Sequence, residues 1–148
     1  MALAIALAGR GGAHRHLTPG ADEHDIGRAT RFYDAALAPL GQHRTDNVPP
    51  GWVAYGGPTY DDGVSLFLCS PFDGRPPNPG NGPMIAFSAK SVAEVRAFHA
   101  AAVANGGSDE GAPGTRAEYG PSFYAAYVRD PDGNKLACVH HHYAPTED

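Results

Sequence analysis

The stretch Arg129-Asp130-Pro131-Asp132-Gly133-Asn134 carries the strongest structural signal in this chain. Proline fixes its own φ at a turn, and glycine or asparagine accepts the positive φ that many tight turns require. Apolar runs that are typical of short strands flank the stretch on both sides, at residues 122–129 and 135–141. The pattern predicts two antiparallel strands joined by a tight turn.

An amphipathic helix is predicted before this hairpin, at residues 92–105, because apolar side chains recur there at three- and four-residue steps. Ser91 offers an N-cap hydroxyl, Glu94 stands three residues later as in a capping box, and two glycines follow the helix. An apolar strand at residues 83–88 precedes the helix, and a short strand is expected near 108–112. The second half of the chain therefore predicts the order βαβββ.

The first half contains a similar helix, predicted at residues 26–40, with Asp25 at the N-cap position and Gly41 just beyond its end. When residues 25–41 are laid on residues 91–107, at an offset of 66, five of the 17 positions are identical. An internal repeat of this kind decides the architecture of a chain. We therefore expect the first half to repeat the plan of the second.

The segments around the first helix extend the repeat. Strand-like runs follow the helix at residues 51–55 and 64–69, and Asp61-Asp62-Gly63 takes the place of the later tight turn. A first strand is expected near residues 17–22, where Pro19 would confine it to an edge or a bulge. The sequence thus predicts an α+β fold made of two tandem βαβββ units.

The length of 148 residues suits a single domain over residues 1–148. Its two units are expected at about residues 13–70 and 82–143, joined by a linker at residues 70–83 that is rich in proline and glycine. Cys69 and Cys138 both lie in apolar runs. This placement predicts buried thiols rather than a disulfide framework or a catalytic nucleophile.

Charge and hydropathy exclude several kinds of partner. The net charge is −5 and there is no basic run, so a nucleic acid is not expected to bind. No apolar stretch approaches the roughly 18 residues of a transmembrane helix, so no membrane partner is expected. The apolar start of the chain lacks the basic residues of a secretory signal. We therefore expect a cytoplasmic protein.

The helix at residues 25–41, the segment at 84–107 and the hairpin at 124–136 together resemble the vicinal oxygen chelate superfamily. This is the group of glyoxalases such as lactoylglutathione lyase, bleomycin-resistance proteins and extradiol dioxygenases, and the resemblance covers about residues 17–142. It implies that the strands of each unit curl into a half-barrel around a concave central cavity. It also implies a homodimer. The shared fold says little about the reaction.

In metal-dependent members of this family, a His or Glu on the first and last strand of each unit holds a divalent metal. The resemblance places these four positions on Thr18, Phe67, Met84 and Ala137, none of which is a usual ligand of such a metal. No cofactor is therefore predicted. A divalent metal held by displaced ligands stays open as an alternative, because the chain contains eight histidines.

Strand alternation predicts which side chains face the cavity and which face the helices. The side chains expected to pack against the helices are Ile85, Phe87, Leu66, Leu68, Leu136 and Cys138. The residues predicted to line a ligand pocket are Thr18, Trp52, Ser65, Phe67, Met84, Ala86, Tyr124, Ala137, Val139 and His141.

Two of these predictions depend on details of the sequence. In the run His140-His141-His142, alternation sends His141 away from its neighbours, which disfavours a metal site and makes His141 the best polar candidate in the pocket. The faces of the tyrosines at 124 and 127 cannot be read from the sequence. Arg116, Glu118 and Tyr119 precede that strand and are candidates for the rim of the pocket.

These observations favour a protein that binds a small apolar or aromatic ligand in the cavity of the fold, without the usual metal centre. No catalytic residue is predicted. Two alternatives remain: an enzyme of the lactoylglutathione-lyase or dioxygenase type that uses displaced metal ligands, and a non-catalytic structural protein whose cavity is filled by its own side chains.

Overall fold

The structure is a computed structural model, and it describes residues 23–46, 48–56, 64–69 and 77–147. Within these ranges, no helix is both long and apolar enough to cross a membrane. Two of the predicted elements, the first strand near residues 17–22 and the turn at Asp61-Asp62-Gly63, lie outside the described residues.

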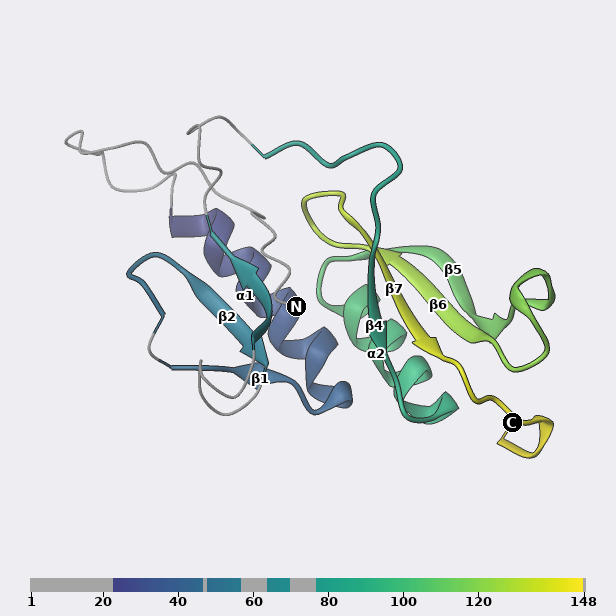
Figure 1. The fold of residues 1–148 in the computed structure, drawn as a ribbon. Coiled ribbons are helices and arrows are strands. Elements are labelled where there is room, and N and C mark those ends of the chain that lie inside the picture. Colours follow the sequence, from purple (N-terminus) through teal and green to yellow (C-terminus); the bar gives the residue numbers. More distant parts are fainter. Residues whose placement is uncertain (1–22, 47, 57–63, 70–76, 148) are drawn as a thin grey trace.

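The second half of the chain forms the predicted βαβββ unit (Figure 1). Its elements are β4 (Ile85–Ser88), α2 (Val92–Ala104), β5 (Ser108–Thr115), β6 (Tyr124–Arg129) and β7 (Lys135–His140). The strands form a four-stranded sheet in the order β4-β7-β6-β5. β4 runs parallel to β7, and the other neighbours are antiparallel.

The first half repeats this plan as far as the structure describes it. Its elements are α1 (Glu23–Leu37), the 3-10 turn η1 (Ala38–Leu40), β1 (His43–Arg44), β2 (Val53–Gly56) and β3 (Val64–Leu68). β1, β2 and β3 form an antiparallel sheet in the same order as β5, β6 and β7. The sequence did not predict β1, because two residues are too few to show an alternating pattern.

The N-terminal ends of α1 and α2 differ in how well they match the predicted N-caps. The expectation that Asp25 caps the first helix is wrong, because α1 already begins at Glu23 and neither glutamate nor histidine stops a helix from extending upstream. The cap of α2 is confirmed. Ser91 Oγ accepts a hydrogen bond of 3.3 Å from the backbone N–H of Glu94, and the Glu94 carboxylate accepts one of 2.7 Å from the N–H of Lys90.

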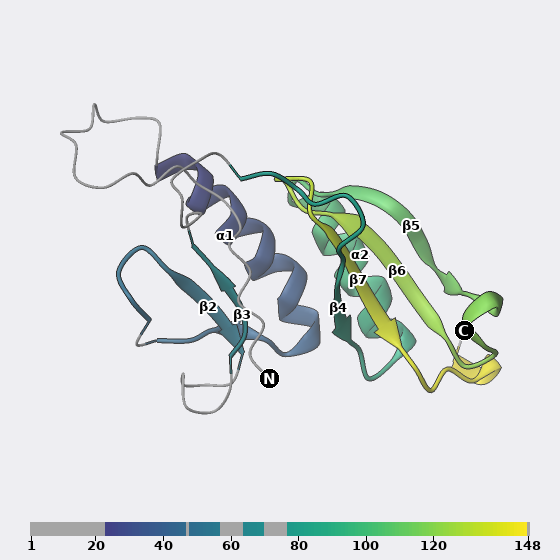
Figure 2. The same ribbon diagram turned by 45° about the horizontal axis from the view of Figure 1, so that its top comes forward.

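One hydrophobic core joins the two units. α1 lies beside the three-stranded sheet, and α2 crosses one face of the four-stranded sheet (Figure 2). The two helices also contact each other. The core contains Phe87, Leu66, Leu68, Leu136 and Cys138, and Ile85 packs against it, so the predicted set of helix-facing side chains is confirmed.

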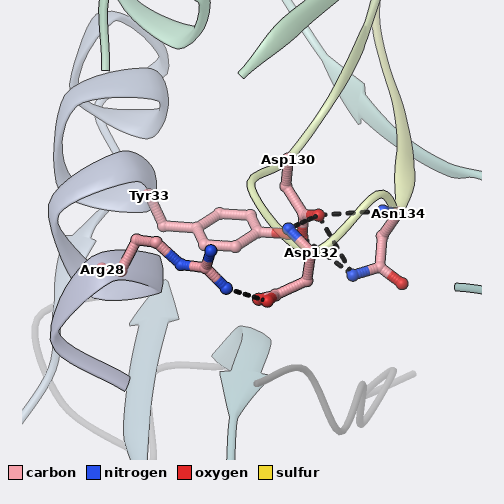
Figure 3. A network of polar contacts seen from close by, with 5 residues as sticks. All are labelled: Arg28, Tyr33, Asp130, Asp132 and Asn134. Carbon is pink, nitrogen blue, oxygen red and sulfur yellow. Dashed lines mark hydrogen bonds and ion pairs between the residues drawn. The ribbon is translucent and has the colours of Figure 1, made fainter. Parts of the chain in front are cut away.

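The carboxylate of Asp130 connects the tight turn to the first helix (Figure 3). Within the turn it accepts hydrogen bonds from the backbone N–H of Asp132 at 2.9 Å and of Asn134 at 2.8 Å, and from the Asn134 side chain. It also accepts a bond of 2.8 Å from the hydroxyl of Tyr33, which lies on α1 and is fully buried. Arg28, one turn before Tyr33, pairs with Asp132.

Removal of the Tyr33 hydroxyl should destabilise the protein. In Tyr33→Phe, the buried Asp130 carboxylate loses a donor, and we expect the free energy of unfolding to fall by about 1–3 kcal/mol. Urea denaturation measures the change. Tyr119→Phe serves as the control, because Tyr119 is 64% exposed, and we expect it to change the unfolding free energy by less than about 0.5 kcal/mol. Equal stability of Tyr33→Phe and the parent protein would contradict this role of Asp130.

The two cysteines are buried and unpaired, as the sequence predicted. Burial raises the pKa of the Cys138 thiol to about 12, with a smaller contribution from Glu94, and burial also raises the pKa of Cys69. Because the thiolate is the reactive form, a buried thiol with a raised pKa is a poor nucleophile. Neither cysteine therefore has the environment of a catalytic residue.

The reactivity of the thiols checks this conclusion. In Cys69→Ala, which leaves Cys138 alone, we expect a disulfide reagent at pH 8 to react at least about 100-fold more slowly with the folded protein than with the protein in urea. The release of the coloured thiol product measures both rates. A folded-state rate close to that in urea would show that Cys138 is accessible and ionised.

Candidate functional site

An open depression of about 950 Å³ lies on the four-stranded sheet, on the face away from α2. The two faces of β6 and β7 are distinguished by alternation. Tyr124, Ala126, Val128, Leu136 and Cys138 belong to the core beneath α2. Their neighbours Ala125, Ala137 and Val139 form a separate buried cluster on the other face, together with the partly buried Phe123 and Tyr127. The depression lies over this second cluster.

Small side chains on the floor of the depression leave room for large rings above them. Ala125 and Ala137 are fully buried, and Tyr127 stands directly across the sheet from Ala137. Phe123 follows as the next ring along the same face. Its ring centroid lies 5.1 Å from that of Tyr119 and 5.3 Å from that of His141. These three rings and Tyr127, four residues from Phe123 along the same face, form the aromatic surface of the depression.

Charged side chains surround the Tyr127 ring. The guanidinium carbon of Arg116 lies 5.4 Å from the ring centroid, and Lys135 Nζ lies 5.5 Å from it. Glu110 receives a hydrogen bond of 2.6 Å from Arg129 and lies 3.5 Å from Lys135 Nζ. The hydrogen bond from Arg129 is the main reason why the pKa of Glu110 is lowered. Burial raises the pKa of Tyr127, so its hydroxyl remains protonated at neutral pH.

Five of the predicted pocket residues lie on or near this face. Met84 and His141 line the depression. Ala137 and Val139 lie beneath the rings of Tyr127 and Phe123 and form the floor. Ala86 is exposed on β4, which pairs with β7 at the edge of the sheet.

Tyr124 lies on the opposite face, so the expectation that it lines the pocket needs correction. It is buried in the core beneath α2, where its hydroxyl accepts a hydrogen bond of 3.2 Å from Arg96. Tyr127, which is three residues later and therefore has the other parity, faces the depression. The sequence could not separate the two tyrosines, because β6 carries an aromatic ring and alanine on each face.

The predicted residues of the first unit lie apart from the depression. Trp52 and Phe67 pack against each other, with ring centroids 5.7 Å apart, on the face of β3 opposite the core residues Leu66 and Leu68. Trp52 borders a smaller hollow of about 450 Å³ beside Arg44. Thr18 and the side chain of Ser65 lie outside the described residues.

Several lining residues were not among the predicted pocket set. Phe123 shares the parity of Tyr127 and could have been found once that parity was known. Arg116, Glu118 and Tyr119 were candidates for the rim, and all three line the depression. Glu110 and Lys135 carried no signal in the sequence, because charged residues in a strand usually face solvent.

The described residues at the predicted metal-ligand positions include no usual ligand of a divalent metal. Phe67 is buried against Trp52, Ala137 is fully buried, and Met84 offers only a thioether. A thioether is a poor ligand for a hard divalent metal. Across the described part of the chain, no three His, Cys, Asp or Glu side chains are grouped so that they could hold a metal ion.

Solved structures share this fold. The chain is 37% identical to a glyoxalase/bleomycin resistance protein from Albidiferax ferrireducens T118, with 77% of this chain and 88% of that chain covered and a TM-score of 0.65. A lactoylglutathione lyase from Agrobacterium tumefaciens is similar in fold at 20% identity, with 95% of this chain and 91% of that chain covered and a TM-score of 0.53. A search of the curated proteins finds no match.

A protein-family model covers most of the chain. The model of the Glyoxalase/Bleomycin resistance protein/Dioxygenase superfamily matches residues 23–138. The matched range begins with α1 and ends in β7, so it includes both helices, most of both units and the tight turn between β6 and β7. The chain therefore belongs to the Glyoxalase/Bleomycin resistance protein/Dioxygenase superfamily.

Proposed function

We propose that this protein binds a small, planar, largely apolar ligand in the depression of the four-stranded sheet, without a divalent metal at the family's usual positions. The aromatic surface formed by Tyr119, Phe123, Tyr127 and His141 carries this proposal. Under this proposal, the four-stranded sheet forms one half-barrel, and its aromatic face is the concave side of that half-barrel. A volume of about 950 Å³ suits a small molecule.

The energetics favour a planar ligand. An aromatic ring prefers offset-stacked or edge-to-face contact with another ring, and such pairs contribute roughly 0.5–1.5 kcal/mol beyond the burial of apolar area. Tyr119 is 64% exposed and Met84 is 46% exposed, so a bound ligand would remove apolar surface from water at two sides of the depression. Such a surface is a common feature of ligand sites.

The residues of the depression favour binding over metal-dependent catalysis. The predicted ligand positions Phe67, Met84 and Ala137 hold no usual ligand of a divalent metal, and the described lining residues include no cysteine, serine or threonine to act as a nucleophile. Sequestration of a small molecule requires only the aromatic and charged surface that is present. We therefore favour a role as a small-molecule-binding protein.

A change at Tyr127 should weaken binding of a neutral ring compound. We expect 2-naphthol to bind the parent protein and to bind Tyr127→Leu about three- to tenfold more weakly, because leucine covers Ala137 but offers no ring face. Isothermal titration calorimetry measures both affinities. Trp52→Leu is the matched control, since Trp52 is an exposed ring just before β2 and away from the depression, and the affinity of this variant should equal that of the parent protein. If Trp52→Leu weakens binding and Tyr127→Leu does not, the site lies on the first unit instead.

Removal of metal ions should leave this binding intact. We expect protein without a histidine tag to bind 2-naphthol with the same affinity before and after dialysis against a chelator, because the described ligand positions offer no suitable donors. Calorimetry and metal analysis of the same samples provide the comparison. A stoichiometric divalent metal whose loss abolishes binding would instead support displaced ligands.

A further inference from the structure

We propose that Arg116 makes the depression selective for planar ligands that carry a carboxylate. This inference rests on the proposed function and names the chemical class of its ligand. It begins from the position of Arg116, which lies at the end of β5 and before the 3-10 turn η3 (Ala117–Tyr119). Its backbone N–H donates to the carbonyl of Phe123, and its carbonyl accepts from the N–H of Tyr119, each at 3.0 Å. The backbone of Arg116 is thus tied to two residues of the aromatic surface.

The side chain of Arg116 is held against its own strand. Nη2 donates to the carbonyl of Ala112 at 2.8 Å, and Nη1 donates to the carbonyl of Thr115 at 3.0 Å. These bonds place the guanidinium beside the Tyr127 ring, within cation–π distance. They use two of the five N–H donors of a guanidinium, so three remain for a ligand.

Two glycines of β5 create the space for this arrangement. A Cβ atom on Gly114 would lie 3.1 Å from Arg116 Nη1. A Cβ atom on Gly111 would lie 3.0 Å from Cδ2 of Tyr127 and 3.4 Å from Arg116 Nη2. The distances of 3.0 and 3.1 Å are shorter than ordinary contacts, so a side chain at Gly111 would push the Tyr127 ring away and one at Gly114 would push the guanidinium away. The two glycines of β5 therefore leave room for the Arg116 guanidinium to lie beside the Tyr127 ring.

Arg116 forms no ion pair with a carboxylate of the described residues. Arg129 and Lys135, the other cations near the depression, both pair with Glu110. Arg116 bonds only to carbonyl groups, and in the described part of the chain no carboxylate lies within ion-pair distance of it. Glu118 also lines the depression but is exposed, so water solvates its charge. A bound carboxylate would give Arg116 the ion-pair partner that it lacks.

The chemistry of a guanidinium identifies the ligand class. Its planar set of N–H donors matches the two oxygens of a carboxylate, and the bonds are strengthened by the opposite charges. A ring attached to that carboxylate would lie over Tyr127, the ring that the Arg116 guanidinium contacts. The arrangement therefore fits an aromatic carboxylate better than a neutral aromatic compound of the same shape.

The test compares 2-naphthoate with 2-naphthamide, which has the same rings but no charge. At neutral pH and low salt, we expect the parent protein to bind 2-naphthoate about tenfold more tightly, as calorimetry measures. Arg116→Gln should lower the affinity for 2-naphthoate about tenfold and the affinity for 2-naphthamide much less, so that the preference for the carboxylate is lost. Arg116→Lys should restore part of the preference, because it keeps the charge but lacks the planar donors.

Arg31→Gln is the matched control, since it removes an equal charge from an exposed position on α1. It should keep the full preference for 2-naphthoate. If the parent protein binds both compounds equally, or if Arg116→Gln weakens both to the same extent, this inference is overturned while the binding proposal stands. If the parent protein binds neither compound, both proposals fail. Should Arg116→Gln not fold, the parent protein and Arg116→Lys decide the matter.

Discussion

The interaction on which the rest of the structure depends is the hydrogen bonding of the Asp130 carboxylate. It closes the turn between β6 and β7 and accepts the hydroxyl of Tyr33 from α1. Because α1 belongs to the first unit and the turn to the second, this one group joins the two halves. Burial, followed by the charge of Asp130, raises the pKa of Tyr33, so its hydroxyl keeps its proton and continues to donate. The two units then share one core rather than two small ones.

The same packing decides which face of the second sheet remains open. α2 covers the face that carries Val128, Leu136 and Cys138, and the odd-numbered residues of β6 are left on the other side. On that side, alanine or glycine occurs next to each large planar group. Ala137 lies beneath the Tyr127 ring, and two glycines of β5 lie beside the Arg116 guanidinium. The depression thus combines apolar ring faces with a guanidinium that has no ion-pair partner among the described residues.

Sequence reasoning recovered those features that local patterns determine. The turn, both helices, the cap of α2 and the burial of Phe87, Leu136 and Cys138 follow from residue type and periodicity. β6 did not reveal its faces, because the run Tyr124-Ala-Ala-Tyr-Val-Arg does not alternate between apolar and polar residues. The helix start at Glu23 and the two-residue β1 lacked distinct signals. The fold of Arg116 back along β5 depends on hydrogen bonds to the backbone carbonyls of Ala112 and Thr115, and such bonds leave no signal in residue type.

The position of the ligand site is the central claim, and backbone amide NMR during a titration with 2-naphthol tests it most directly. This account predicts that the largest shifts occur on β5, η3 and β6, including the amides of Gly111, Phe123 and Tyr127, which surround the depression. Shifts that cluster instead around Trp52 and Phe67, on the three-stranded sheet, would contradict it.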